Sequence, residues 1–170
     1  MALWRVSAQG GKDKTMGSSI GVDMAQLAGL LIDCDVDPLC PSGLRVAEES
    51  EQVPGRVRGK FQWDPANVRL YLSPGQQDGM FIDGHKLRKE LKKKQVFGVW
   101  LLDLLLAHPE LIPDEWRGKT VFFWGTIYRD SAGRLCVRYL DWVGERWNSD
   151  YDWLDGNFYD DDPAACSQVA

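Results

Sequence analysis

The sequence predicts an α+β domain, in which an antiparallel three-stranded meander packs with two helices and follows an irregular N-terminal region. Three observations carry this prediction. Residues 108–153 hold many aromatic residues between turn signals, residues 84–107 contain two helical patterns, and residues 1–59 are rich in Gly and Pro turn signals. A short hairpin upstream of the helices could extend the meander into a five-stranded sheet.

Length and composition indicate one soluble globular domain. The chain has 170 residues, of which 44% are hydrophobic and 26% charged, and a chain of this size can bury a core without disulfides or metal. The net charge of −5 argues mildly against a general nucleic-acid binder. No apolar run is long enough to span a membrane and no export signal is evident, so we expect a cytoplasmic protein with no membrane partner.

The four cysteines do not indicate a metal or redox site. Cys34, Cys40, Cys136 and Cys166 lack the CxxC or CxxH spacing of zinc and thioredoxin-type sites. Cys136 lies within a strand pattern and should be a buried thiol, whereas Cys34 and Cys40 could pair if the protein were exported. We therefore expect no cofactor and no metal.

Composition divides the chain into three parts. Residues 1–59 are expected to form an irregular N-terminal region that could be mobile, with one short helix at about 22–32. Residues 60–159 are expected to form the compact α+β domain. Residues 160–170 are expected to form an acidic, flexible tail, because a run of three Asp and a Pro suggests the end of the ordered chain.

The first half of the compact domain contains a strand pair and two helices. Residues 68–72 and 80–82 have strand patterns and could form a hairpin. The helix at 84–95 carries two leucines one turn apart and an otherwise charged surface. The helix at 98–107 is apolar on most sides, so it should be the buried helix of the domain, and Pro109 ends it.

The turns of the meander predict its register. The three strands are expected at about 120–129, 134–142 and 146–154. A three-residue loop before Arg134 would place Asp130 opposite Arg134 and pair opposite charges. The sequence Gly144-Glu145 suits a two-residue type II′ turn. A slip of one residue in the first hairpin would exchange the faces of the first strand only.

Alternation along the strands then assigns each side chain to a face. One face takes Val121, Phe123, Ile127, Leu135, Val137, Tyr139, Asn148, Asp150 and Asp152. The other, which we call the aromatic face, takes Phe122, Trp124, Thr126, Tyr128, Arg138, Leu140, Trp142, Trp147, Tyr151 and Trp153. In this register Trp142 faces Trp147, and Arg138 faces Tyr151 in a cation–π arrangement.

The aromatic face leads to the main hypothesis on function. We predict a non-enzymatic binding or protein-interaction module that uses this face, or a groove at its edge, to hold a protein or a small ligand that stacks on aromatic rings. The predicted ligand-binding residues are Trp124, Tyr128, Arg138, Trp142, Trp147, Tyr151 and Trp153. The alternative is that this face is the core beneath the helices, and the sequence favours it because aromatic side chains dominate cores.

Two further interpretations stay open. The helix at 84–95 has a local charge of +5 and could bind nucleic acid through Lys86, Lys89, Lys92 and Lys93, although a solvated helix surface explains the charge more simply. A small hydrolase with a carboxylate site would need two close carboxylates, or a carboxylate near His85 or His108. No catalytic motif is present and no catalytic residue is predicted, so the sequence argues against an enzyme.

Several segments resemble a group of small uncharacterised bacterial hypothetical proteins. These segments are FQWDPANVRLYLSPGQ, HKLRKEL, LLAHPELIPDEWRGKTVFFWGTIYRDSAGRLCVRYLDW and the tail rich in Trp and Asp. The similarity runs from about residue 61 to 164, is most specific over 105–142, and departs at 96–100, where the group has a more polar helix start. The resemblance implies a bacterial, cytoplasmic, single-domain protein and transfers no activity, cofactor or functional residue.

Overall fold

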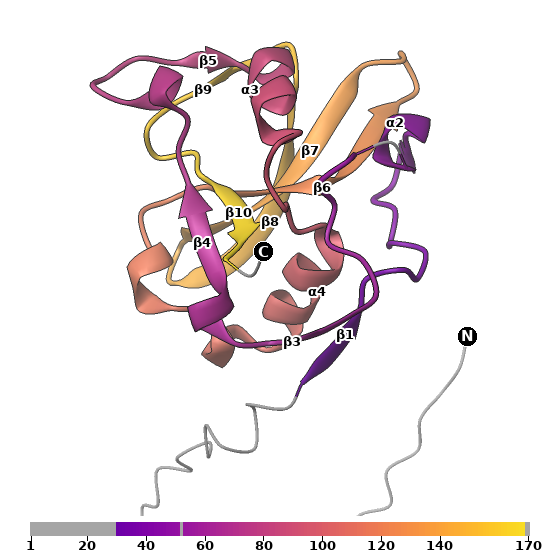
Figure 1. Cartoon of the computed structure of the whole chain (residues 1–170), viewed down its shortest axis with the longest axis vertical. Helices are drawn as coiled ribbons and strands as arrows, with labels where there is room; N and C mark the ends of the chain where they lie inside the picture. The colour runs from indigo at the N-terminus through magenta and orange to yellow at the C-terminus, as the bar shows by residue number, and fades with distance from the viewer. Residues whose placement is uncertain (1–29, 52, 169–170) are drawn as a thin grey trace, which may run out of the picture.

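The structure, a computed structural model, describes residues 30–51 and 53–168 (Figure 1). Within these residues the fold is α+β, with two main helices, one six-stranded mixed sheet and two small two-stranded sheets. The elements in chain order are β1 (Leu31–Asp33), β2 (Leu44–Val46), α2 (Glu48–Glu51), β3 (Lys60–Gln62), η1 (Pro65–Asn67), β4 (Val68–Tyr71), η2 (Pro74–Gln76), β5 (Ile82–Asp83), α3 (Gly84–Leu91), α4 (Val99–Ala107), η3 (Pro109–Leu111), η4 (Asp114–Trp116), β6 (Val121–Asp130), β7 (Leu135–Val143), β8 (Arg146–Trp153), β9 (Asn157–Phe158) and β10 (Ala164–Ser167).

The main sheet has the order β4-β10-β6-β7-β8, and β2 pairs with the far end of β6. Strand β10 is antiparallel to β4 and parallel to β6, so the end of the chain lies between two earlier strands (Figure 1). The predicted flexible tail is therefore wrong for residues 164–167, of which Ala164, Ala165 and Cys166 are buried. The buried Gln76 secures the preceding loop, because its Nε2 donates to Tyr159 O at 2.7 Å and to Asp162 O at 2.9 Å.

Three further predictions in the first half of the chain need correction. Strand β5 pairs with β9 rather than with β4, so the expected hairpin is absent from the described residues and β10 extends the sheet instead. The helix expected at 22–32 is wrong for Leu31 and Ile32, which lie in β1, and residues 22–29 of it fall outside the described residues. Strands β1 and β3 pair across the expected boundary at residue 60.

The helices have local reasons for their limits. Asp83 begins α3, because its side chain accepts the Lys86 N–H at 3.1 Å. This helix ends at Leu91, so it is shorter than the expected 84–95, whereas α4 agrees closely with the expected 98–107. Over the described residues, every helix falls short of the length and apolar character that crossing a membrane requires.

The meander forms with the register that its turns predict. Asp130 N–H donates to Arg134 O at 3.0 Å, and Ile127, Tyr128 and Arg129 pair with the expected residues of β7. In the second hairpin Val143 lies opposite Arg146. Gly144 and Glu145 both have positive φ, which is the pattern of a type I′ turn rather than the expected type II′.

An irregularity in β6 overturns part of the face assignment. Phe122 pairs with Tyr139 and Ile127 pairs with Val137, so four residues of β6 lie opposite Arg138 alone. Val121 and Phe123 consequently join the aromatic face, whereas Phe122 and Trp124 pack on the opposite face. Gly125 lies within this irregularity. The position requires glycine, because a Cβ there would lie 2.6 Å from Gly98 N.

The sheet separates two cores. On the aromatic face, α4 packs with Phe123, Tyr128 and Leu140 in the larger cluster. On the opposite face, Leu87 and Leu91 of α3 pack in a second cluster with Phe122, Trp124 and Phe158. The Phe158 ring lies 4.9 Å from that of Phe122 and 5.2 Å from that of Trp124, measured between centroids, so this second core is itself an aromatic cluster.

Candidate functional site

The seven predicted ligand-binding residues do not form one exposed surface. Trp124 is 2% exposed and lies on the opposite face from the other six, and Tyr128 is fully buried. The remaining five are half-buried side chains, namely Arg138, Trp142, Trp147, Tyr151 and Trp153. A stacking surface on this face would need a largely exposed tryptophan among residues 124, 142, 147 and 153, and none of the four is largely exposed, although three keep partial access to solvent.

Arg138 lies at the centre of a polar cluster beneath α4. Its guanidinium donates to Asp103 Oδ1 at 2.9 Å and to Ser149 Oγ at 3.1 Å. Arg138 pairs with Tyr151 in register as expected, but its charge is directed to Asp103 rather than held by a cation–π contact with that ring. Burial raises the pKa of the Asp103 carboxyl, and the charge of Arg138 opposes this shift.

Tyr128 belongs to the same cluster and connects it to the segment after β1. The Tyr128 hydroxyl donates to Leu39 O at 2.8 Å, and burial raises its pKa well above the ordinary range. The Trp100 indole donates to Val36 O at 2.7 Å, and the Arg56 guanidinium lies 4.3 Å from the centroid of the Trp100 ring. Two buried rings thus hold the segment at its backbone carbonyls and leave its side chains free to face outward.

A groove of about 330 Å³ lies between this segment and α4. It is lined by Leu31, Ile32, Asp33, Val36, Asp37, Pro38, Leu39, Trp100, Asp103 and Leu104, and we call it the 31–39 groove. Three large aliphatic side chains on its border are exposed, Leu31 by 58%, Val36 by 51% and Leu39 by 73%. Isolated exposed aliphatic residues are ordinary, but a group of them around one groove is typical of an interaction surface.

The charges at the 31–39 groove are acidic. Asp33 and Asp37 line it, and the neighbouring Asp35 is exposed. Asp103 also lines the groove, but Arg138 balances its charge. The groove therefore combines an apolar floor with exposed carboxylates, which suits a ligand that carries both apolar side chains and positive charge.

The half-buried aromatics form pairs along β7 and β8. The Trp142 and Trp147 rings lie 5.3 Å apart between centroids in the expected cross-strand contact, and Tyr151 and Trp153 lie 5.2 Å apart. Arg117 covers Trp142 at 4.2 Å and Arg134 covers Trp153 at 3.9 Å. Guanidinium groups thus already occupy ring faces that a stacking ligand would need.

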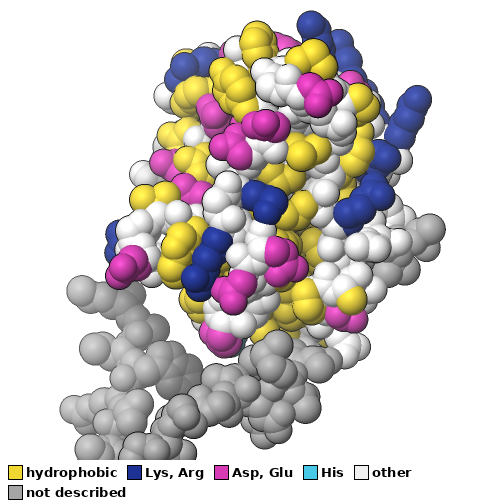
Figure 2. Space-filling model, turned by 90° about the vertical axis from the view of Figure 1, so that its left-hand side faces the viewer, with side chains coloured by type: hydrophobic (Ala, Val, Ile, Leu, Met, Phe, Trp, Pro, Cys, Tyr) yellow, Lys and Arg dark blue, Asp and Glu magenta, His cyan; other side chains and the backbone are white. Residues whose placement is uncertain are grey.

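The lysines of the nucleic-acid hypothesis lie on or just after α3, on the sheet face opposite Arg138. Lys86, Lys89, Lys92 and Lys93 are exposed, whereas Leu87 and Leu91 anchor the helix. Figure 2 shows basic side chains gathered along the upper right margin of one face and acidic side chains in separate patches beside them. Of the arginines that could have continued this basic surface, Arg138 binds Asp103 and Arg134 binds Asp130.

Among the described residues, the features that a hydrolase would need are a carboxylate pair, Asp141 and Asp150, which line one open hollow, and two histidine–carboxylate pairs on the surface. His85 lies 2.9 Å from Asp155 and His108 lies 3.3 Å from Glu110, but both pairs are exposed and outside the 31–39 groove. Burial raises the pKa of the Cys34, Cys136 and Cys166 thiols to about 11, which disfavours the nucleophilic thiolate. Among the described residues, His, Cys, Asp and Glu nowhere form a group of three that could hold a metal ion.

The sequence reasoning missed the residues of the groove. Leu31 had been placed in a helix, and Val36 and Leu39 in an irregular region with no role. One signal was available, because Ile32, Cys34 and Val36 alternate with Asp33, Asp35 and Asp37, which is the pattern of a strand with one apolar side. Asp103 carried a second signal, since it is the one charged residue in the otherwise apolar helix α4.

Comparisons with known proteins identify no relative of this chain. No family model, curated protein or solved structure matches the chain.

Proposed function

We propose that the protein is a non-enzymatic interaction module, and that its binding site is the 31–39 groove at the edge of the aromatic face. The single observation that supports this most is the exposure of Leu31, Val36 and Leu39 around one groove. Leaving such side chains in water has a cost, because burying an aliphatic side chain of this size stabilises by roughly 1.5–3 kcal/mol. A partner that covers all three gains that free energy on binding.

The partner that fits this groove is a peptide segment with apolar side chains and a nearby Lys or Arg. The apolar side chains would contact Leu31, Val36 and Leu39, and the positive charge would lie near Asp33 or Asp37. The backbone of the segment is held by Trp100 and Tyr128, so little ordering entropy would be lost on binding. The polar cluster around Arg138 then supports the groove from below and reaches it only through Asp103.

A displayed library of short random peptides tests this proposal. Peptides selected on the whole protein should combine apolar residues with Lys or Arg, and the double variant Leu31→Ser with Leu39→Ser should bind them at least about tenfold more weakly, a loss of about 1.4 kcal/mol. The matched control is Val143→Ser, since Val143 is another exposed aliphatic side chain and lies at the end of β7. Selected peptides that bind both variants equally, or that lack basic residues, would refute the proposal.

Nucleic-acid binding through α3 remains the alternative. It depends on the local charge of α3 and the turn after it, with Lys86, Lys89, Lys92 and Lys93, because Arg134 and Arg138 are paired with acids. A gel shift that weakens steeply with salt would favour it, since phosphate contacts release counterions. The groove has the stronger support because exposed apolar side chains and charge coincide there.

A further inference from the structure

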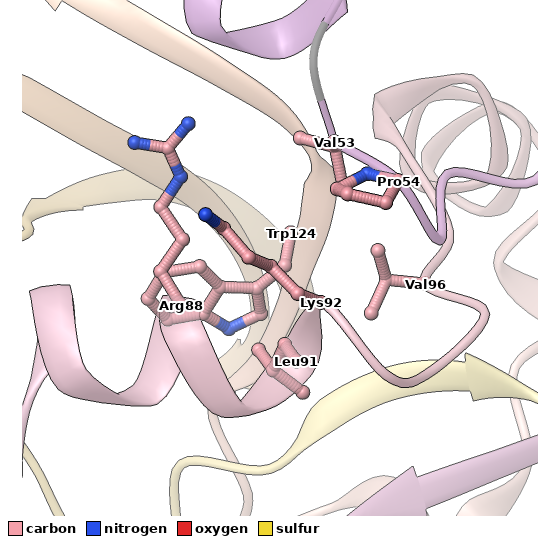
Figure 3. Close-up of a pocket in the computed structure, with 7 residues that line it drawn as sticks. All are labelled: Val53, Pro54, Arg88, Leu91, Lys92, Val96 and Trp124. Carbon is pink, nitrogen blue, oxygen red and sulfur yellow. The ribbon is translucent and has the colours of Figure 1, made fainter.

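A second, smaller pocket lies on the opposite face of the sheet. It is lined by Val53, Pro54, Arg88, Leu91, Lys92, Val96 and Trp124, and we call it the Trp124 pocket (Figure 3). It brings together Trp124 and Lys92, which the sequence had assigned to two unrelated sites. Its residues come from α3 and the turn after it, from the segment after α2, and from the irregular part of β6.

The floor of this pocket contains a hydrogen-bond donor without an acceptor. Trp124 is buried, and within the described part of the chain its Nε1–H has no partner. Leaving a buried donor unpaired costs about 1–3 kcal/mol, which a phenylalanine at this position would avoid. The indole nitrogen is on the side of the ring that faces Leu91, another residue of the pocket (Figure 3). An acceptor that enters the pocket would remove this cost.

The mouth of the pocket is basic. The charged ends of Arg88 and Lys92 lie beyond the edge of the indole that is away from its nitrogen (Figure 3), and Lys92 is exposed whereas Arg88 is half-buried. Both side chains are long and unbranched, so a change of rotamer at Lys92 can open the way to the nitrogen. An acceptor that carries negative charge would therefore meet an N–H at the floor and a cation at the mouth.

The size and lining of the pocket narrow the class of ligand. A volume of about 10 Å³ has room for one water-sized group, which corresponds to a single oxygen atom. Val53 and Pro54 form an apolar rim beside the cations, where an aliphatic chain can lie. A phosphate would meet the same N–H and cations but would leave this rim uncovered. We propose that the Trp124 pocket binds the carboxylate of a short aliphatic acid, with one oxygen at the Trp124 N–H, the other met by Lys92 after a change of its rotamer, and the chain along Val53 and Pro54.

Titration of the full-length, ¹⁵N-labelled protein with sodium butyrate tests this proposal. Sodium chloride is exchanged for butyrate at constant ionic strength, and the indole N–H signals of the eight tryptophans are followed by NMR. The Trp124 signal is assigned from its contact with the Leu91 methyl groups. It should move downfield and saturate while the other seven stay in place, because only this N–H gains a charged acceptor.

Butyrate binding to variants distinguishes a specific site in the pocket from general attraction to the basic helix. Lys92→Ala should weaken butyrate binding about tenfold, since it removes a charge-assisted contact. Lys86→Ala removes the same charge from α3 itself, outside the pocket, and should leave binding unchanged. Trp124→Phe keeps the ring and removes the donor, and should abolish binding if the variant folds; if it does not, the lysine variants decide.

Three results would overturn the proposal. A Trp124 signal that does not move with butyrate would mean that the N–H is satisfied in another way, such as against the Phe158 ring. Equal weakening by Lys92→Ala and Lys86→Ala would indicate non-specific charge attraction. Equal responses to inorganic phosphate and butyrate would contradict the assignment to aliphatic carboxylates. Each of these results leaves the 31–39 groove unaffected, because the two sites lie on opposite faces of the sheet.

Discussion

Removing the carboxylate of Asp103 tests how the aromatic face is held to α4. The Asp103→Ala variant leaves the Arg138 guanidinium with two neutral neighbours, Ser149 Oγ and the Tyr128 hydroxyl, and no carboxylate. The Asp103 side chain is 26% exposed and that of Arg138 is 12% exposed, so the ion pair is largely removed from water. An unpaired guanidinium at this depth should destabilise the fold.

The expected cost follows from this burial. Breaking a fully buried pair by removing one partner costs about 3–5 kcal/mol, whereas exposed pairs contribute roughly 0–1 kcal/mol. Arg138 keeps its hydrogen bond to Ser149 and some access to solvent, so the loss of folding stability in Asp103→Ala should lie between these limits, at about 2 kcal/mol. The double variant Asp103→Leu with Arg138→Met removes both charges and should cost less than about 1 kcal/mol, because an apolar pair can replace a buried ion pair without penalty.

Urea unfolding followed by circular dichroism measures both quantities. The single variants Asp103→Leu and Arg138→Met and their double variant form a cycle whose coupling free energy should be about 2 kcal/mol. Asp114→Ala is the control, since it removes the exposed pair of Asp114 with Arg117 and should cost less than about 0.5 kcal/mol. A loss of the same small size for Asp103→Ala, or a double variant less stable than either single one, would refute the reasoning.

Three other predictions concern the rest of the sheet. Burial raises the pKa of Asp162 to about 6. The stability that this group contributes is therefore fully present below its unfolded pKa near 4 and is lost as the pH rises through about 6. Asp162→Asn should remove about 2 kcal/mol of this pH dependence, measured by urea unfolding between pH 4 and 7.5. Asp150 and Asp152 accept the N–H of the residue that follows each of them on the edge strand β8, so changing both to Ser should increase self-association, measured by light scattering. Gly125→Ala should cost about 3 kcal/mol or more, because its Cβ would lie within 3 Å of backbone atoms, whereas Gly75→Ala should stay within about 1 kcal/mol.

Each of these predictions has a result that contradicts it. Equal pH profiles for the wild type and Asp162→Asn would show that another group causes the dependence. The control for the edge strand is Asp155→Ser with Asp160→Ser, which changes the net charge equally away from β8; equal association in both pairs would attribute the effect to charge alone. If Gly125→Ala were as stable as Gly75→Ala, the close approach to Gly98 would have no importance.

Local signals predicted the meander well and its connections poorly. The loop before Arg134 and the turn at Gly144 each depend on a few adjacent residues, so both registers could be read from the sequence. The pairing of β10 with β4 and β6 joins residues far apart along the chain, and its short strand of small residues resembles a loop in composition. The candidate site was predicted only in part, because Arg138 was identified without its partner Asp103.

By itself, the sequence determined the α+β class, the buried helix α4 and the hairpin registers, because hydrophobic periodicity and turn geometry are local properties. The tertiary structure alone decided which face each aromatic occupies. The irregularity in β6 at Gly125, imposed by the close approach of Gly98, moves Trp124 to the face of α3. The tertiary structure also decided where the 31–39 groove lies. Tyr128 and Trp100 hold that segment through hydrogen bonds to backbone carbonyls, and no side-chain pattern in the sequence reveals such bonds.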